Sequence, residues 1–200
     1  MCITDVISLI GSFVVLLTAI VGLYGVRTWK RETQFKRRFE LAEKVLANAY
    51  EAVEVIDFIR FPASRNDEGQ SRKQNEEETP SQTNSLNNLY VIKERYINRN
   101  DSFKRLFKIR FQVKAVFEEK LYENLNAILK MPNKIFTVVD HYADTIMRPD
   151  SYTAEEKDEI QREYSKVVFA RLTKKEEDPI YNEMKDALQN LEEECRKILK

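Results

Sequence analysis

The first pattern along the chain is an uncharged apolar run near its start. Residues 6–26 (VISLIGSFVVLLTAIVGLYGV) carry no charged side chain over 21 positions. An α-helix rises about 1.5 Å per residue, so this run spans about 30 Å, the thickness of the hydrocarbon core of a bilayer. A cleaved signal peptide would have a basic region before a shorter apolar core, whereas here the preceding charged residue is the acidic Asp5. The sequence therefore predicts an uncleaved transmembrane anchor within residues 1–26.

Basic residues follow the apolar run directly and predict its orientation. The juxtamembrane basic cluster consists of Arg27, Lys30, Arg31, Lys36, Arg37 and Arg38. Because basic residues stay on the cytoplasmic side, the N-terminus is predicted to face outward and residues 27–200 to lie in the cytoplasm. Tyr24 and Trp29 occupy the position of an interfacial aromatic belt. We expect the cluster to contact anionic headgroups of the lipid bilayer, as a topology signal in the favoured interpretation and as a polybasic switch in the other.

Small residues recur along one side of the predicted transmembrane helix. Gly11, Thr18, Gly22 and Gly25 follow one another at spacings of seven, four and three residues. Such a stripe lets two membrane helices approach closely, so it is a candidate surface for a homo-oligomer. Small residues are also common in membrane helices that do not associate, and the spacing leaves both possibilities open.

A helical pattern continues beyond the anchor. Apolar residues recur at steps of three and four at Phe35, Phe39, Ala42, Leu46, Ala49, Val53 and Ile56. This periodicity predicts one amphipathic helix over residues 27–61, which Pro62 ends. Residues 62–84 have almost no apolar content and contain Gly69 and two prolines, so they predict a mobile loop.

The remaining sequence is also helical in pattern, with no convincing strand. A second long helix is predicted over residues 85–130, bent near residues 98–101. Three shorter helices are indicated by start signals at Pro132, at Thr153 with Glu156, and at Asp178 with Pro179. The predicted fold is all-α, with the transmembrane helix continuing into a cytoplasmic bundle of two long antiparallel helices and about three shorter ones. The alternative is a dimer in which the same apolar faces pair between two chains.

Composition removes several classes of enzyme site. Residues 70–200 contain no glycine, so they cannot form a P-loop, a dinucleotide fingerprint or a nucleophile elbow. Cys2 and Cys195 lie at opposite ends of the chain and His141 is the single histidine, so neither a zinc site nor a di-metal site is predicted, and no cofactor is expected. Cys195 falls on the apolar side of the last predicted helix, where a core position is expected.

Asp140 and His141 are the one pair of residues that resembles acid–base machinery. A carboxylate beside an imidazole occurs in such machinery, but adjacent positions on a helix point in different directions. No serine, cysteine or metal cluster lies at a helical spacing nearby. We therefore interpret His141 as a surface or core residue and expect no enzymatic activity.

Charge is balanced over the whole chain but unevenly distributed along it. The chain has 33 basic and 33 acidic residues, yet residues 93–120 contain nine basic and four acidic side chains. Four phenylalanines lie among them, Phe103, Phe107, Phe111 and Phe117. A basic helix with aromatic residues is one pattern of nucleic-acid binding. We expect these phenylalanines mostly in the core and the basic residues paired with the acidic C-terminal helices, which disfavours nucleic acid as a partner.

The overall layout resembles a group of uncharacterised bacterial proteins with one N-terminal membrane helix, a long helix, a variable loop and a second long helix. The resemblance lies in WKRE at 29–32, ELAEKVL at 40–46, Tyr50, Asp57, Phe58 and Arg60 before Pro62, YVIKERY at 90–96, DPIY at 178–181 and LEEEC at 191–195. It implies the same topology in a bacterial plasma (inner) membrane and adds no catalytic residue, because the group has no assigned activity.

These patterns lead to two hypotheses about function. The first is a non-enzymatic, membrane-anchored helical scaffold that interacts with itself or with an unknown protein partner at the cytoplasmic face. The second is a membrane-tethered sensor or effector in stress response or phage defence, with the loop 62–84 or the juxtamembrane basic cluster as its switch. A catalytic site in the bundle would rest on Asp140 and His141 alone.

Overall fold

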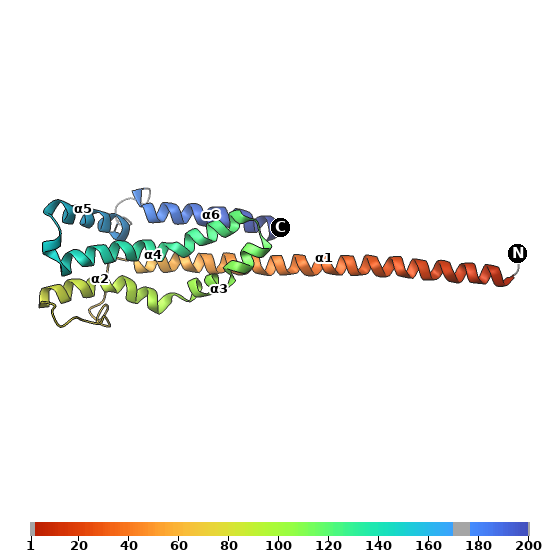
Figure 1. Cartoon of the computed structure of the whole chain (residues 1–200), viewed down its shortest axis with the longest axis horizontal. Helices are drawn as coiled ribbons and strands as arrows, with labels where there is room; N and C mark the ends of the chain where they lie inside the picture. The colour runs from red at the N-terminus through yellow and green to blue at the C-terminus, as the bar shows by residue number, and fades with distance from the viewer. Residues whose placement is uncertain (1–2, 170–176, 200) are drawn as a thin grey trace. The chain divides into compact units, whose positions relative to one another are not determined.

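The computed structural model describes residues 3–169 and 177–199, and within these ranges all regular structure is helical (Figure 1). Six α-helices are found there: α1 (Ile3–Ile59), α2 (Pro80–Arg99), α3 (Asp101–Val116), α4 (Glu119–Met147), α5 (Ala154–Tyr164) and α6 (Pro179–Leu199). A short 3₁₀ turn, Pro149–Ser151, precedes α5, and a π-helical turn, Ser165–Phe169, follows it. The all-α fold class is confirmed.

The chain divides into two compact units. The N-terminal unit covers residues 1–42 and the helical unit covers residues 43–200. In the N-terminal unit the described backbone belongs to α1 throughout. The helical unit contains the last part of α1 together with α2 to α6.

Within the helical unit, the last part of α1 has a fully buried apolar face. Val45, Ala49, Ala52, Ile56 and Ile59 have no solvent exposure, and their spacings of four, three, four and three place them on one side of the helix. The buried face includes Ala49 and Ile56 of the predicted stripe, whereas Val45 and Ala52 are buried in place of their predicted neighbours Leu46 and Val53. Ala42 of the predicted stripe is fully buried as well. The helix ends at Ile59, three residues before Pro62, as the proline predicts.

The predicted long helix over residues 85–130 is wrong, because this stretch is divided among α2, α3 and α4. Asn100 separates α2 from α3, and the pair Phe117–Glu118 separates α3 from α4. The first break agrees with the predicted bend, and the second was not predicted. Both breaks let successive apolar faces reach the core, since Ile92 on α2 and Leu106 on α3 are both buried.

The structure also corrects the predicted starts of two helices. α2 begins at Pro80, because Thr79 and Gln82 form a capping box and proline is favoured in the first helical turn. The loop after α1 is therefore shorter than residues 62–84. Pro132 does not start a helix but lies inside α4, where it is buried.

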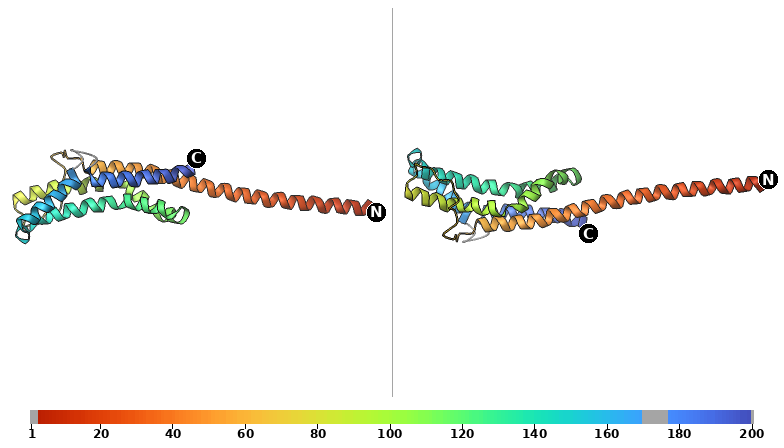
Figure 2. Two further views of the ribbon diagram at one scale, coloured as in Figure 1. Left: turned by 90° about the horizontal axis from the view of Figure 1, so that it is seen from above. Right: turned by 90° about the horizontal axis from the view of Figure 1, so that it is seen from below.

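α4 is the central helix of the helical unit. It packs against α2, α3, α5 and α6 (Figure 2). Leu125, Ile128, Met131 and Ile135 are fully buried along it. The predicted antiparallel pair of two long helices is thus replaced by a bundle in which α4 packs against four shorter helices.

A buried ion pair joins the end of α1 to the start of α6. Arg60 Nη2 donates to Asp178 Oδ2 over 2.7 Å, and both side chains have no solvent exposure. Arg60 Nε donates to the carbonyl oxygen of Val167 over 2.7 Å. The other carboxylate oxygen of Asp178 accepts the backbone N–H of Tyr181 and so caps α6, as the Asp178–Pro179 start signal predicts.

We expect Asp178→Asn to lower the free energy of unfolding by about 3–5 kcal/mol, because it leaves the buried Arg60 charge without a counter-ion. Asparagine can still cap α6, so the change tests the loss of the negative charge without the loss of the helix cap. Denaturant unfolding of the full chain in a neutral detergent, followed by circular dichroism, measures the effect. The double variant Arg60→Met with Asp178→Asn should recover part of the loss, since no unpaired charge remains. A single variant as stable as the unaltered chain would contradict this role for the pair.

The loop after α1 is attached to α2 by side-chain contacts. Arg72 donates to both carboxylate oxygens of Glu78, and its Nε donates to Asn87 Oδ1 over 2.9 Å. Gly69 adopts a positive φ of 85°, and a Cβ atom there would lie 2.1 Å from the carbonyl oxygen of Asn87. Gly69 N–H donates to Glu94 over 2.5 Å. The loop thus has specific partners on α2, and its mobility stays a prediction.

The Arg72–Glu78 pair predicts a pH dependence of stability. The hydrogen bond from Arg72, followed by that from the Asn75 backbone, lowers the pKa of Glu78 from 4.5 to about 2. A lowered carboxyl pKa contributes stability above pH 4.5, and this contribution is lost as the pH falls from 4.5 towards 2. The unaltered chain should therefore unfold at a higher temperature than Glu78→Gln at pH 7, and the difference should shrink over that window.

The matched control for this titration is Glu76→Gln, which changes an exposed carboxylate in the same loop. Glu76 makes no ion pair within the described ranges. Its variant should follow the unaltered chain at every pH. If the two variants gave the same thermal unfolding profile, the Arg72–Glu78 pair would not stabilise the loop.

Candidate functional site

The exposed apolar segment of α1, residues 13–26, is the strongest functional feature of the N-terminal unit. Its large apolar and aromatic side chains are between 46% and 73% exposed. Of the helices in the described part of the chain, α1 alone is long and apolar enough to cross a membrane. A continuous apolar surface of this kind marks a contact with lipid or with another protein.

The predicted small-residue stripe lies on this same segment. Apart from neighbouring residues and the backbone of α1 itself, no atom in the described part of the chain lies within 4 Å of the position that a Cβ would take at Gly11, Gly22 or Gly25. The Thr18 hydroxyl donates to the carbonyl oxygen of Val14 over 2.8 Å, within the helix. The stripe is therefore open in the single chain, and its contact with a second copy stays a prediction.

The juxtamembrane basic cluster is also exposed. All six of its members, and the aromatic residues Tyr24 and Trp29, have high solvent exposure. Arg27, Lys30, Arg31, Lys36 and Arg37 form no ion pair with any residue in the described part of the chain. Their charges are therefore available to an external anion.

The structure separates the two residues of the acid–base candidate. Asp140 forms an ion pair with Lys93 of α2, whereas the His141 ring lies 6.3 Å from the ring of Tyr152. The two side chains have different neighbours, as their adjacent helical positions predict. The structure thus gives His141 no carboxylate partner at position 140.

Cys195 occupies the predicted core position. Its side chain is fully buried on α6, and this burial raises the pKa of the thiol to about 11. A thiol with such a pKa is largely protonated near neutral pH, so it is a weak nucleophile. Cys2 lies outside the described residues.

The α3 phenylalanines differ from the sequence prediction. Phe103 is buried, as expected, but Phe107 and Phe111 are 54% and 61% exposed. The Arg110 guanidinium lies over both exposed rings, 3.5 Å and 4.5 Å from their centroids. The prediction was wrong for Phe107, which was placed on the core stripe, because α3 is a short separate helix whose buried face includes Leu106 and Val113. Phe111 was not part of that stripe.

Predicted pairing of the basic residues of 93–120 with the acidic C-terminal helices is found at one position, where Lys120 pairs with Glu194 over 3.3 Å. Lys134, beyond this stretch, also pairs with a residue of α6, Glu183. Other basic residues have different partners, such as Arg105 with Glu51 of α1. Internal ion pairs therefore take up part of the positive charge of residues 93–120.

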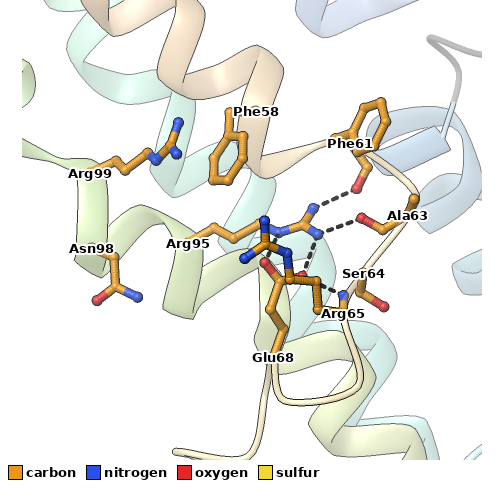
Figure 3. Close-up of a pocket in the computed structure, with 9 residues that line it drawn as sticks. All are labelled: Phe58, Phe61, Ala63, Ser64, Arg65, Glu68, Arg95, Asn98 and Arg99. Carbon is orange, nitrogen blue, oxygen red and sulfur yellow. Dashed lines mark hydrogen bonds and ion pairs between the residues drawn. The ribbon is translucent and has the colours of Figure 1, made fainter.

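A cavity of about 490 Å³ lies where the end of α1, the following loop and α2 meet (Figure 3). Its lining consists of Phe58, Phe61, Ala63, Ser64, Arg65, Glu68, Arg95, Asn98 and Arg99. Arg95 extends from α2 to the loop, where Nη1 donates to the Phe61 carbonyl and Nη2 to the Ala63 carbonyl, each over 2.6 Å. One side chain thus holds the loop backbone at the edge of the cavity.

The carboxylate of Glu68 completes the contacts of Arg95. Arg95 Nη2 and Nε donate to Glu68 over 2.5 Å and 3.2 Å, and the backbone N–H of Arg65 donates to Glu68 over 3.1 Å. The hydrogen bond from Arg95 lowers the pKa of Glu68. Sequence analysis missed this site, although the spacing of Arg95 and Arg99 places two guanidinium groups on one side of a helix.

No protein-family model, curated protein or solved structure matches this chain. The resemblance to uncharacterised bacterial membrane proteins is not tested by these comparisons and stays a prediction. Over the residues that are described, no group of three or more His, Cys, Asp and Glu side chains is placed to hold a metal ion.

Proposed function

We propose that the chain is a single-pass membrane protein whose N-terminus faces outward and whose helical unit lies at the cytoplasmic face of a bacterial plasma membrane. The exposed apolar segment of α1, followed directly by the juxtamembrane basic cluster, carries this proposal. Each Leu, Ile, Phe or Val in the centre of a membrane helix contributes roughly −0.3 to −0.6 kcal/mol to insertion. Each basic residue near anionic headgroups adds about 1 kcal/mol.

The proposed role of the helical unit is interaction rather than catalysis. Two observations support it: the acid–base candidate is separated, and the Cys195 thiol is buried with a raised pKa. An anchored bundle increases the local concentration of whatever it binds at the membrane. Its partners are anionic lipid, a second copy of the chain through the small-residue stripe, or another protein.

A membrane-tethered sensor or effector is the second candidate. The observation that favours it is the arrangement of the loop after α1, whose residues 61–65 form one wall of the cavity and are held there by Arg95. A ligand in that cavity would contact the loop directly, as a switch requires.

The orientation can be tested with the two native cysteines. In a Cys195→Ala background, a membrane-impermeant maleimide should label Cys2 in intact spheroplasts, because the N-terminus is proposed to face outward. The protein should also stay in the membrane fraction after alkaline carbonate extraction. Labelling of Cys2 only after permeabilisation would contradict the orientation, and release by carbonate would contradict the anchor.

Two matched triple variants test whether basic residues beside the apolar segment set the orientation, or whether any loss of positive charge has the same effect. Changing Arg27, Lys30 and Arg31 to Gln should reduce the outward labelling of Cys2, because these residues adjoin the apolar segment. Changing Lys104, Lys108 and Lys114 to Gln removes the same charge far from the segment and should leave the labelling unchanged. Equal effects of the two triple variants would contradict a local topology signal.

Self-association can be tested by mass determination in nanodiscs. We expect the full chain to be a dimer or larger, and Gly22→Leu with Gly25→Leu to convert it to a monomer, because larger side chains separate the helices. Val21→Leu with Leu23→Ile changes the neighbouring positions without filling the stripe and is the control. A monomeric unaltered chain would remove self-association from the proposal and leave other proteins as the partner.

A further inference from the structure

We propose that the cavity at the end of α1 binds a small organic phosphate, with the phosphoryl group between Arg65 and Arg99 and its apolar part against Phe61. All residues that line the cavity belong to the helical unit. The proposal does not depend on membrane insertion, and the two can fail separately.

The lining of the cavity keeps a positive charge after Arg95 has paired with Glu68. Three arginines and one glutamate line it. Arg95 is 5% exposed, and its donors are directed to Glu68 and to two loop carbonyls. Glu68 is therefore neutralised by a residue that is itself fixed. The charge of Arg65 also acts on Glu68, but three arginines and one glutamate leave the cavity with a net positive charge.

Arg65 and Arg99 have donors that a ligand can reach. Neither side chain forms an ion pair with any other residue that the structure describes. A guanidinium group presents paired N–H donors that match two oxygens of a phosphoryl group. Arg99 is held in place because its guanidinium carbon lies 3.8 Å from the centroid of the Phe58 ring. Arg65 lies by Glu68, which accepts its backbone N–H, and Figure 3 draws its side chain beside the Arg95–Glu68 contact, whereas Arg99 lies by Phe58.

The size and the remaining lining of the cavity also suit such a ligand. A volume of about 490 Å³ suits a small organic ligand better than a bare ion. Phe61 is 54% exposed at the rim and offers an apolar surface. Ser64 and Asn98 add a hydroxyl group and an amide group that can donate to phosphoryl oxygens.

The test uses the full chain in dodecyl maltoside micelles, which contain no phosphate. Isothermal titration with adenosine monophosphate, inorganic phosphate and adenosine measures binding. We expect adenosine monophosphate to bind most tightly, inorganic phosphate more weakly and adenosine least. Because hydrogen bonds to charged groups are worth about 1.5–3 kcal/mol, Arg65→Gln and Arg99→Gln should each weaken binding by about tenfold or more.

Two controls show whether the loss of affinity is specific to the arginines of the cavity. Lys108→Gln removes one exposed charge on α3, outside the cavity, and should leave the affinity unchanged. Arg99→Lys keeps the charge but removes the paired donors, so it should recover only part of the affinity. Circular dichroism and thermal unfolding of each variant show whether it is folded. The proposal is overturned if no phosphate-containing probe binds, or if the Arg65, Arg99 and Lys108 variants bind equally well.

A second arm identifies the source of the phosphoryl group. The titration is repeated in nanodiscs of phosphatidylcholine with and without one-third phosphatidylglycerol. If the anionic lipid displaces adenosine monophosphate and Arg99→Gln abolishes this competition, the phosphoryl group belongs to a lipid headgroup. If the lipid has no effect, the phosphoryl site takes a free ligand. Displacement that is unchanged in Arg99→Gln would overturn the assignment of that arginine.

Discussion

The buried ion pair of Arg60 and Asp178 is the constraint on which the helical unit depends. The two residues are 118 positions apart, and neither side chain has any solvent exposure. Removing two charges from water is costly, so the pair persists only with good geometry and further hydrogen bonds. Val167 and the N-terminus of α6 provide these bonds. A single contact thus aligns the end of α1, the π-helical turn and the start of α6.

Other features of the helical unit follow from that alignment. Arg60 comes directly after the buried face of α1, so the ion pair fixes the point at which the chain leaves the core. Phe61 and Ala63 come next, and their carbonyl groups are the ones that Arg95 contacts. The cavity is therefore built on a segment of backbone that is held from two sides, by Asp178 through Arg60 and by α2 through Arg95.

The sequence predicted those parts of the fold that depend on local chemistry. The helix starts at Thr153 and Asp178 were predicted from capping residues, and both are found, because a cap satisfies backbone donors within a few positions. The break at Asn100 was predicted only as a bend, and the break at Phe117 was not predicted, since apolar residues continue at helical spacing on both sides. Their positions depend on how α2 and α3 pack against α4. The spacing of apolar residues along the chain does not show this packing.

The same division applies to the candidate sites. The exposed apolar segment and the basic cluster could be predicted because composition alone distinguishes them. The exposure of Phe107 and Phe111 could not, since it depends on where α3 begins and ends. The cavity was missed because its main contacts join the Arg95 side chain to the backbone of a loop, and backbone carbonyls carry no sequence signal.

The two attachments of the loop after α1 have a consequence for chain-length variation. Arg95 and Glu68 hold its first part, and the Arg72–Glu78 pair holds its second part. Between the residues of that pair lie residues 73–77, all exposed. Doubling the length of a flexible loop costs only about 0.6 kcal/mol of closure entropy. Insertions within residues 73–77 therefore enlarge a segment whose ends are already fixed, and related chains can differ in length here while keeping the same helical core.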